Sequence, residues 1–258
     1  MGRKGILMYE REINELQKII DDSTNIVFFG GAGVSTESGI PDFRSADGLY
    51  HQKYKYSPEQ VVSHSFFMKY PEAFYEFYKD KMMCLEAKPN AAHNKLSELE
   101  SSGKLKAVVT QNIDGLHQKA GSKTVYELHG SIHRNYCMKC QKSYDANYVK
   151  NQNGIPYCEC GGMIKPDVVL YEEGLDGNVI NAAIRAIASA DTLIIGGTSL
   201  VVYPAAGFID YFQGKHLVVI NKSETGKAVN AELSINAPIG EIMSGIIAVS
   251  YTHLTLPT

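Results

Sequence analysis

Four cysteines lie close together at spacings that suit a metal ion. Cys137 and Cys140 form a C-x-x-C pair, and 17 residues separate this pair from Cys158 and Cys160. Because the chain shows no export signal, this clustering favours metal binding over disulfides. Four thiolates complete a tetrahedral site and leave no position for water, so we predict a structural zinc. A nucleic-acid-binding zinc ribbon is the alternative for this segment, and the few flanking lysines and arginines weaken it.

The second cysteine pair is unusually tight, because one residue separates Cys158 from Cys160 where two are usual. Gly161 and Gly162 follow directly, and glycine gives the backbone the freedom to bring Cys160 round. We therefore expect all four thiolates to bind one ion.

A glycine-rich loop suited to phosphate follows an apolar run. The loop reads Gly-Gly-Ala-Gly at 30–33, and its backbone N–H groups could approach a pyrophosphate. It departs from the dehydrogenase fingerprint because Thr36 replaces the third glycine and no acidic residue ends a second strand about twenty residues on. Pro41 forces the residue before it into an extended conformation, so a helix begun at Gly33 must end by Gly39.

The segment after this proline brings three different functional groups beside the loop. Asp42, Phe43 and Arg44 supply a carboxylate, an aromatic ring and a guanidinium. A surface turn is one interpretation of this segment. A flap over a bound nucleotide is the other.

Two further groups of residues could perform proton chemistry. His129 ends an apolar run and precedes a glycine that leaves room for a ligand, and imidazole titrates near neutral pH, as a general base should. His117 is its nearest rival. Asn112 and Asp114 are common turn formers, but in an extended segment they would point to the same side.

The elements that position these residues alternate between strands and helices. We expect strands at 25–29, 106–110, 124–128, 192–195 and 216–220, and helices at 8–20, 72–86, 91–101 and 178–189. This alternation predicts an α/β fold with a parallel sheet and helices on both faces. Ligands of such sheets bind beyond the carboxyl ends of the strands, where the candidate residues lie.

Composition excludes several classes of protein. With 258 residues, 44% of them hydrophobic, the chain can bury a substantial core. A formal net charge of -3 gives no general basic face for nucleic acid. No apolar run is long enough for a signal sequence or a membrane span, so we expect a cytoplasmic protein.

The motifs together resemble the sirtuins, the NAD-dependent protein lysine deacylases, and most closely a bacterial-type deacetylase. The segments that carry the resemblance are GAGVSTESGIPDFR, TQNIDGLH, ELHG and GTSLVVYPAA, in this order, together with the cysteine cluster. The similarity runs from about residue 10 to about residue 245.

The resemblance implies a division into two parts. A discontinuous Rossmann-like NAD-binding domain would comprise 1–45, 90–130 and 170–247, and a small helical and zinc-ribbon module would comprise 46–89 and 131–169. An acetyl-lysine peptide would enter the cleft between them. We assign no function to residues 248–258, whose sequence does not look like a closing helix.

The resemblance also implies the chemistry. The acyl oxygen would attack the nicotinamide ribose of NAD and release nicotinamide, and a base would then activate a ribose hydroxyl. His129 would be that base, with Asn112 and Asp114 as the other catalytic residues and His117 as a supporting group beside the ribose. O-acetyl-ADP-ribose would be the product, and the protein would act as a monomer.

The remaining contacts come from the same resemblance. Those to NAD would be made by Ala32, Gly33, Thr36, Asp42, Phe43, Arg44, Gln111, Ile113, Asp114, His129, Gly197, Thr198, Ser199, Asn221 and Lys222. Val168, Val169 and Tyr171 would contact the substrate, and an extended peptide would add as a strand along this edge. Glu172 stands where the family usually has glycine.

Two other functions remain open, and so does the acyl group. The chain could transfer ADP-ribose to an acceptor, or it could be a non-catalytic zinc-containing nucleotide-binding regulator. Sirtuins that remove succinyl groups resemble one another in a Tyr-x-x-Arg motif. This chain has Tyr75 and Tyr78 at those positions, which also suits simple aromatic packing. Without the arginine a succinyl carboxylate would lack a partner, so we expect acetyl to be preferred by at least roughly a hundredfold.

Overall fold

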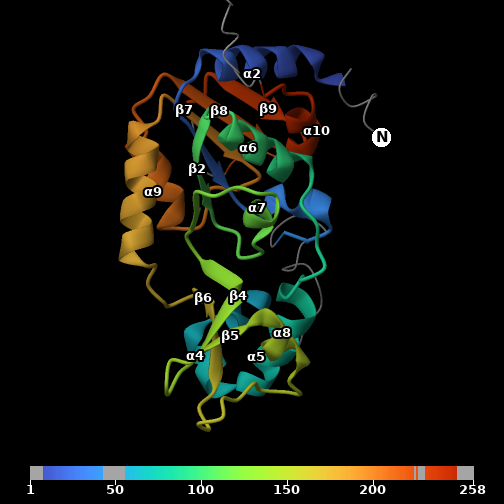
Figure 1. The fold of residues 1–258 in the computed structure, drawn as a ribbon, viewed down its shortest axis with the longest axis vertical. Helices are drawn as coiled ribbons and strands as arrows, with labels where there is room; N and C mark the ends of the chain where they lie inside the picture. Colours follow the sequence, from blue (N-terminus) through green and yellow to red (C-terminus); the bar gives the residue numbers. More distant parts are fainter. Residues whose placement is uncertain (1–7, 43–55, 224, 226–229, 249–258) are drawn as a thin grey trace, which may run out of the picture.

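A computed structural model describes residues 8–42, 56–223, 225 and 230–248 of the chain. Phe43 and Arg44 therefore lie outside the described residues. Figure 1 shows a large upper part built round one sheet and a smaller lower part. Among the described residues, none of the helices has both the length and the apolar character needed to cross a membrane.

The large part contains a six-stranded parallel sheet in the order β3-β2-β1-β7-β8-β9. Its strands are β1 (Ile26–Gly30), β2 (Leu105–Thr110), β3 (Val125–Glu127), β7 (Thr192–Gly196), β8 (His216–Asn221) and β9 (Leu233–Asn236). The predicted α/β class is confirmed, and the first five strands coincide with predicted runs. The sixth, β9, was not predicted, because its four residues are alternately buried and exposed and give little apolar signal.

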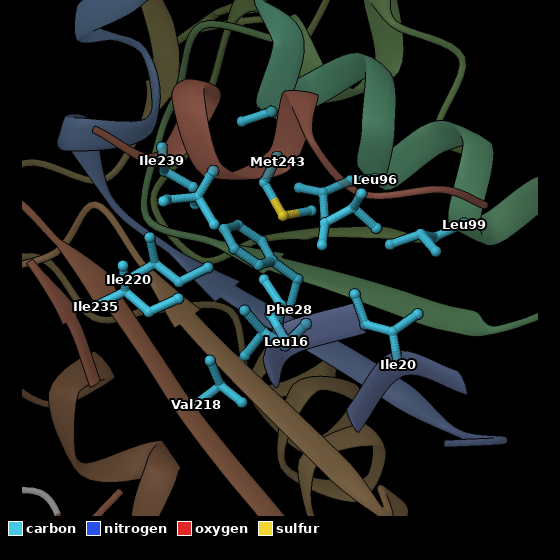
Figure 2. Packing of buried hydrophobic residues seen from close by; sticks show 14 of the residues in the cluster. Leu16, Ile20, Phe28, Leu96, Leu99, Val218, Ile220, Ile235, Ile239 and Met243 are labelled. Atoms are coloured by element: carbon cyan, nitrogen blue, oxygen red, sulfur yellow. The ribbon is translucent and has the colours of Figure 1, made fainter. Parts of the chain in front are cut away.

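Alternate residues of the central strands enter two separate cores. Phe28 of β1 packs on one face of the sheet with residues of α2 (Glu10–Asp22), α6 (Ala91–Ser101) and α10 (Ile239–Ser244). Figure 2 shows its ring beneath Leu96 and Met243, at the point where α6 and α10 meet. Val27 and Phe29 pack on the other face with α9 (Gly177–Ser189) and the 3-10 helix at Ala205–Tyr211. Helices thus cover both faces, as the alternation of elements predicted.

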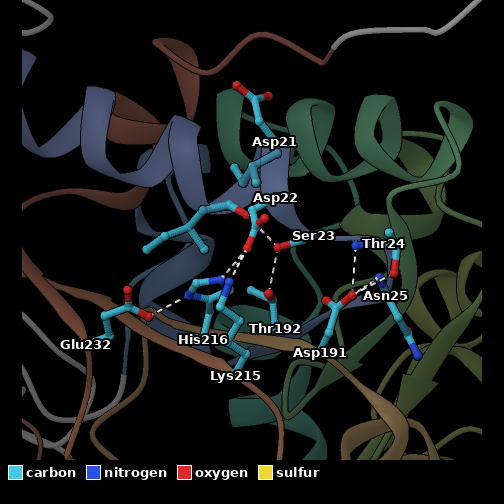
Figure 3. Close-up of polar contacts among 12 residues, drawn as sticks. Asp21, Asp22, Ser23, Thr24, Asn25, Asp191, Thr192, Lys215, His216 and Glu232 are labelled. Atoms are coloured by element: carbon cyan, nitrogen blue, oxygen red, sulfur yellow. Dashed lines mark hydrogen bonds and ion pairs between the residues drawn. The ribbon is translucent and has the colours of Figure 1, made fainter.

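The amino-terminal ends of the strands are joined by polar contacts. The Asp191 carboxylate, just before β7, accepts hydrogen bonds from the backbone N–H groups of Thr24 and Asn25, at 2.8 and 2.9 Å, just before β1. Figure 3 shows this contact beside His216, whose ring lies between Asp22 and Glu232. These contacts fix the end of the sheet opposite to the carboxyl ends of the strands.

The small part combines a three-stranded antiparallel sheet with short helices. The sheet has the order β5-β4-β6, formed by β4 (Gly130–Cys137), β5 (Ser143–Asp145) and β6 (Ile164–Val168). The helices are α3 (Pro58–Val61), α4 (His64–Lys69), α5 (Pro71–Phe77) and α8 (Ala146–Asn151). One aromatic-rich core joins these elements.

Two predicted helical segments are not regular α-helices along their whole length. The helix expected at 72–86 is α5 followed by a π-helical turn at Tyr78–Met82, and it ends at Met83, whose ψ of 66° is not helical. After the glycine-rich loop the chain makes two 3-10 turns, Ala32–Val34 and Thr36–Ser38. The second turn ends at Gly39, in the left-handed region with φ of 81°, where the sequence predicted a stop.

Candidate active site

A cleft of about 990 Å³ lies at the carboxyl ends of β1, β2 and β7 and reaches the small part. One wall is formed by the residues that follow these three strands, together with His129, which precedes β4. The segment after β6 forms another wall. Of the predicted site residues, the cleft brings together Ala32, Gly33, Thr36, Asp42, Gln111, Asn112, Ile113, Asp114, His129, Val168, Val169, Tyr171, Gly197, Thr198, Ser199, Asn221 and Lys222.

The glycine-rich loop is pressed against the turn that follows β7. The Gly33 N–H donates to the Gly197 carbonyl at 2.8 Å, and a Cβ at Gly33 would lie only 2.8 Å from the Gly197 Cα. Gly197 itself has φ of 56°, in the region that favours glycine. A side chain at either position would push the two turns apart, so the glycines allow the backbones of the two turns to lie against each other in the wall of the cleft.

Ser35 joins the two predicted polar residues that follow β2. Its hydroxyl donates to Asp114 Oδ2 at 2.7 Å and accepts from Asn112 Nδ2 at 3.1 Å. Asp114 Oδ1 accepts the Leu116 N–H at 2.9 Å, so both of its oxygens are engaged. The expectation that Asn112 and Asp114 point to the same side is confirmed by their shared partner. Ser35 was not singled out from the sequence, although it lies within a quoted motif.

His129 is held in one tautomer. Its Nδ1 lies 2.9 Å from the Gln111 carbonyl oxygen, which can only accept, so Nδ1 carries the proton and Nε2 carries the lone pair. Burial lowers the pKa of His129 from its ordinary value, and the hydrogen bond to Gln111 opposes this effect only in part. The ring is therefore kept neutral and able to accept a proton. Gly130 follows with φ of 75°, where a Cβ would clash with the Asp167 carbonyl oxygen.

The end of the cleft at β8 is organised by Asn221. Its Nδ2 donates to the Thr198 carbonyl at 3.0 Å and to the Ser223 carbonyl at 2.9 Å. The turn after β7 and the turn after β8 are thereby joined. Ser223, Ala237 and Pro238 also line this end and were not predicted. Pro238 precedes α10, and no chemical signal in the sequence distinguishes it.

The edge expected to receive a peptide strand is already paired within the chain. The N–H groups of Val169 and Tyr171 donate to the carbonyls of His129 and Val62, and the Leu170 N–H donates to the Glu173 carboxylate. A peptide that adds along this run would therefore have to pair with backbone groups other than these three N–H groups, and its addition here stays a prediction. Val168, Val169 and Tyr171 nevertheless line the cleft.

Glu172 adopts the left-handed conformation, with φ of 76°. This conformation is unfavourable for a residue with a Cβ, which explains why glycine suits the position. The Glu172 carboxylate accepts hydrogen bonds from the Ser65 N–H and hydroxyl, both at 2.9 Å. These bonds anchor the turn to the start of α4.

The structure corrects the expectation for His117 and decides between the two interpretations of Tyr75 and Tyr78. His117 does not line the cleft, because its ring is fully buried between Phe28 and His93. Tyr75 and Tyr78 are likewise fully buried, in the core of the small part, and the residues of this segment that do line the cleft are Lys81 and Met82. The aromatic-packing interpretation of the two tyrosines is therefore confirmed, since Tyr75 contacts Phe67 of α4 and both rings lie in the core of the small part.

The four cysteines form one group at the end of the small sheet. Their Sγ atoms all lie within 4.8 Å of one another, with 3.4 Å between those of Cys137 and Cys160 and 3.5 Å between those of Cys140 and Cys158. Zinc–sulfur bonds of about 2.3 Å in a tetrahedron separate the sulfurs by about 3.8 Å, so the group fits zinc. Gly161, with φ of 78°, makes the tight turn that brings Cys160 round.

Comparison with known proteins agrees with this site. A profile of the Sir2 family matches residues 31–204. The chain is 61% identical over 240 residues to a protein of Clostridium acetobutylicum named NAD-dependent protein deacetylase, covering 92% of this chain and 98% of that protein. A protein of the same name from Clostridium perfringens is 62% identical with the same coverage.

Solved structures give the same result. A complex described as Sir2 with p53 peptide and NAD+ has a TM-score of 0.80 at 40% identity, covering 90% of this chain and 95% of that chain. A Sir2 variant described with deacetylated p53 peptide and 3'-O-acetyl ADP-ribose has a TM-score of 0.83 at 39% identity, covering 90% and 96%. These likenesses extend over nearly the whole described fold. The chain belongs to the Sir2 family, the sirtuins.

Proposed function

We propose that this sirtuin is an NAD-dependent protein lysine deacetylase. It transfers the acetyl group of acetyl-lysine to ADP-ribose and releases nicotinamide and O-acetyl-ADP-ribose. The names of the Clostridium relatives support this activity, as do the peptide and acetyl ADP-ribose described for similar structures. We further propose a cytoplasmic location, since four cysteines arranged to hold zinc suit a reducing compartment.

The observation that carries the proposal is the neutral His129 in the same cleft as the Asn112–Ser35–Asp114 network. The Nε2 of His129 is free of the Gln111 contact and is oriented as a proton acceptor. The network holds an amide and a carboxylate in fixed positions beside it. Such a site can orient a sugar and remove a proton from one of its hydroxyls.

The cleft fits NAD along its length. The turns that meet at Gly33 and Gly197 line the cleft with backbone and small side chains, which suits a pyrophosphate, and Thr36 lines the same loop. Gln111 Nε2 is buried without a hydrogen-bond partner among the described residues, and a ribose hydroxyl would satisfy it. Bound NAD supplies an electrophilic ribose carbon and nicotinamide as its leaving group.

Each group of residues in the cleft then has a distinct role. His129 Nε2 accepts a proton from a ribose hydroxyl, and the Gln111 carbonyl keeps the ring in the required tautomer. Asn112 orients the reacting ribose, and Asp114 with the Ile113 backbone holds the nicotinamide amide. Thr198, Ser199, Asn221 and Lys222 contact the adenosine half. Val168, Val169 and Tyr171 contact the acyl-lysine and its peptide.

Nicotinamide release from NAD, measured with and without an acetyl-lysine peptide, tests the proposal. Strict dependence on the peptide, with equal amounts of O-acetyl-ADP-ribose formed, is the expected result. Transfer of labelled ADP-ribose to protein would instead support a transferase. If folded protein with bound zinc releases no nicotinamide with or without the peptide, a non-catalytic nucleotide-binding regulator would be supported. The same peptide carrying a succinyl group measures the preference for acetyl, which stays a prediction.

A further inference from the structure

Asn90 contacts two separate segments of the large part, the start of α6 and the turns after the glycine-rich loop. It is the residue before α6, and its Oδ1 accepts the N–H groups of Ala92 at 2.9 Å and His93 at 3.5 Å. This is an ordinary N-cap, which satisfies backbone donors at the start of the helix. Its Nδ2 points the other way, toward the turns that follow the glycine-rich loop. One side chain thus joins a rigid helix to the floor of the cleft.

The two contacts of Nδ2 lie on either side of Ser35. Nδ2 donates to the Val34 carbonyl at 2.7 Å and to the Ser38 hydroxyl at 3.1 Å. Ser35 lies between these two anchors and holds both Asn112 and Asp114. The position of the Ser35 hydroxyl therefore depends on a short segment that Asn90 fixes at both ends.

The helix that carries Asn90 is a firm support. Leu96 and Leu99 of α6 are fully buried in the same core as Phe28, which belongs to the strand that leads into the loop. A second helix holds the same segment, since the Glu37 carboxylate accepts the Gly240 N–H at the start of α10 at 2.7 Å. Because α6 and α10 pack together over the sheet, the two attachments share one rigid base (Figure 2).

We propose that Asn90 is a positioning residue for the reaction, which acts by holding the 34–38 segment so that Ser35 orients Asn112 and Asp114. This inference rests on the proposed deacetylase function. Asn90 does not line the cleft, so it acts through Ser35. Loss of its amide donor shifts the network without removing any group that lines the cleft. A small misplacement of this kind reduces the rate of a reaction that depends on orientation.

The two roles of Asn90 can be separated by substitution. Asn90→Ser keeps a good N-cap acceptor but is too short to hold Val34 and Ser38, whereas Asn90→Ala loses both functions. Asn94→Gly is the matched control, because it weakens the same helix at an exposed asparagine that makes no contact with the loop. We expect Asn90→Ser to lose between roughly tenfold and a hundredfold in kcat/KM for NAD while its melting temperature stays close to that of the wild type.

Amide hydrogen exchange of the ligand-free protein supplies a second measurement that does not depend on activity. The N–H groups of Ser38, Gly39 and Ile40 are hydrogen-bonded within the 35–40 segment and should exchange faster in Asn90→Ser, while those of α6 should not. Unchanged kcat/KM in Asn90→Ser, or a loss in Asn94→Gly as large as in Asn90→Ser, would overturn the inference. If the wild type itself releases no nicotinamide, the proposed function fails instead, and the exchange experiment still tests the contact.

Discussion

The Nδ1 atom of His129 lies 2.9 Å from the carbonyl oxygen of Gln111, and this contact leaves Nε2 as the ring's proton acceptor. His129→Ala removes the acceptor but none of the glycine-loop contacts to NAD. We therefore expect deacetylation to fall about 10²- to 10⁴-fold, while the affinity for NAD is largely kept. Turnover and NAD binding by the purified, folded variant measure the two effects. Near wild-type turnover would show that His129 is not the base.

The same histidine sets the acid limit of activity. Burial lowers the pKa of His129, and only its neutral form can accept a proton. The ring therefore becomes protonated at a lower pH than an ordinary imidazole does. We expect the acid limb of kcat/KM against pH to have its midpoint below about 6.5, the usual value for histidine. A midpoint above that value would contradict the effect of burial.

The cysteine group gives a prediction about metal content. Cys160→Ala leaves three thiolates, which should bind zinc poorly and loosen the small part. Cys84→Ala is the matched control, because Cys84 is a free cysteine outside the group. We expect one zinc per chain in the wild type and in Cys84→Ala, and a clear loss in Cys160→Ala, by direct metal analysis. Full zinc content in Cys160→Ala would remove this residue from the ligand set.

Stability should depend on pH through His216. Burial opposes protonation of its ring, but hydrogen bonds to Asp22 and Glu232 outweigh it and raise the pKa of His216. A raised pKa stabilises the fold below the unfolded value of about 6.5, and this contribution is lost as the pH rises through the folded pKa. Asp22 keeps its charge in this range, because hydrogen bonds from Lys215 and His216 lower its pKa to about 2.

His216→Gln should therefore lower the melting temperature more at a pH of about 5.5 than at about 8.5. Arg11→Gln is a suitable control, because it removes a charged partner from an exposed ion pair, Arg11–Glu15, that contains no histidine. If the melting temperatures of the wild type and His216→Gln differ by the same amount at both pH values, His216 does not carry a stabilising charge.

The sequence predicts the strands of the large sheet better than the contacts between residues that are far apart in the chain. Apolar, β-branched runs identify five of the six strands of the large sheet, most clearly β1 and β7, in which every residue is buried. Ser35 could not be recognised in the same way, since its importance lies in two partners that are 77 and 79 residues away. The paired edge at 169–171 also depends on distant residues, because Val62 and His129 supply its acceptors.

Helical spacing alone could not decide where the two tyrosines of the small part lie. Residues three apart share a face of a helix, so Tyr75 and Tyr78 were correctly expected to lie together. Which way that face points is decided by the surrounding aromatic residues, and here it points into the core. A Tyr78→Arg change, which would suit a succinyl pocket, would instead bury an unpaired guanidinium and cost several kcal/mol of stability.

The two buried hydroxyls should respond differently to removal. Tyr75 donates to the Ile164 carbonyl, whereas the Tyr78 hydroxyl has no hydrogen-bond partner among the described residues. Tyr75→Phe should therefore cost about 1 kcal/mol of the free energy of unfolding, and Tyr78→Phe should be neutral or stabilising, because it removes a buried polar group that gains nothing. Denaturant unfolding of the two variants, which are matched in chemistry and in burial, measures the difference. Equal losses in both would mean that the Tyr78 hydroxyl has a partner in solution, and a larger loss in Tyr78→Phe would reverse the assignment.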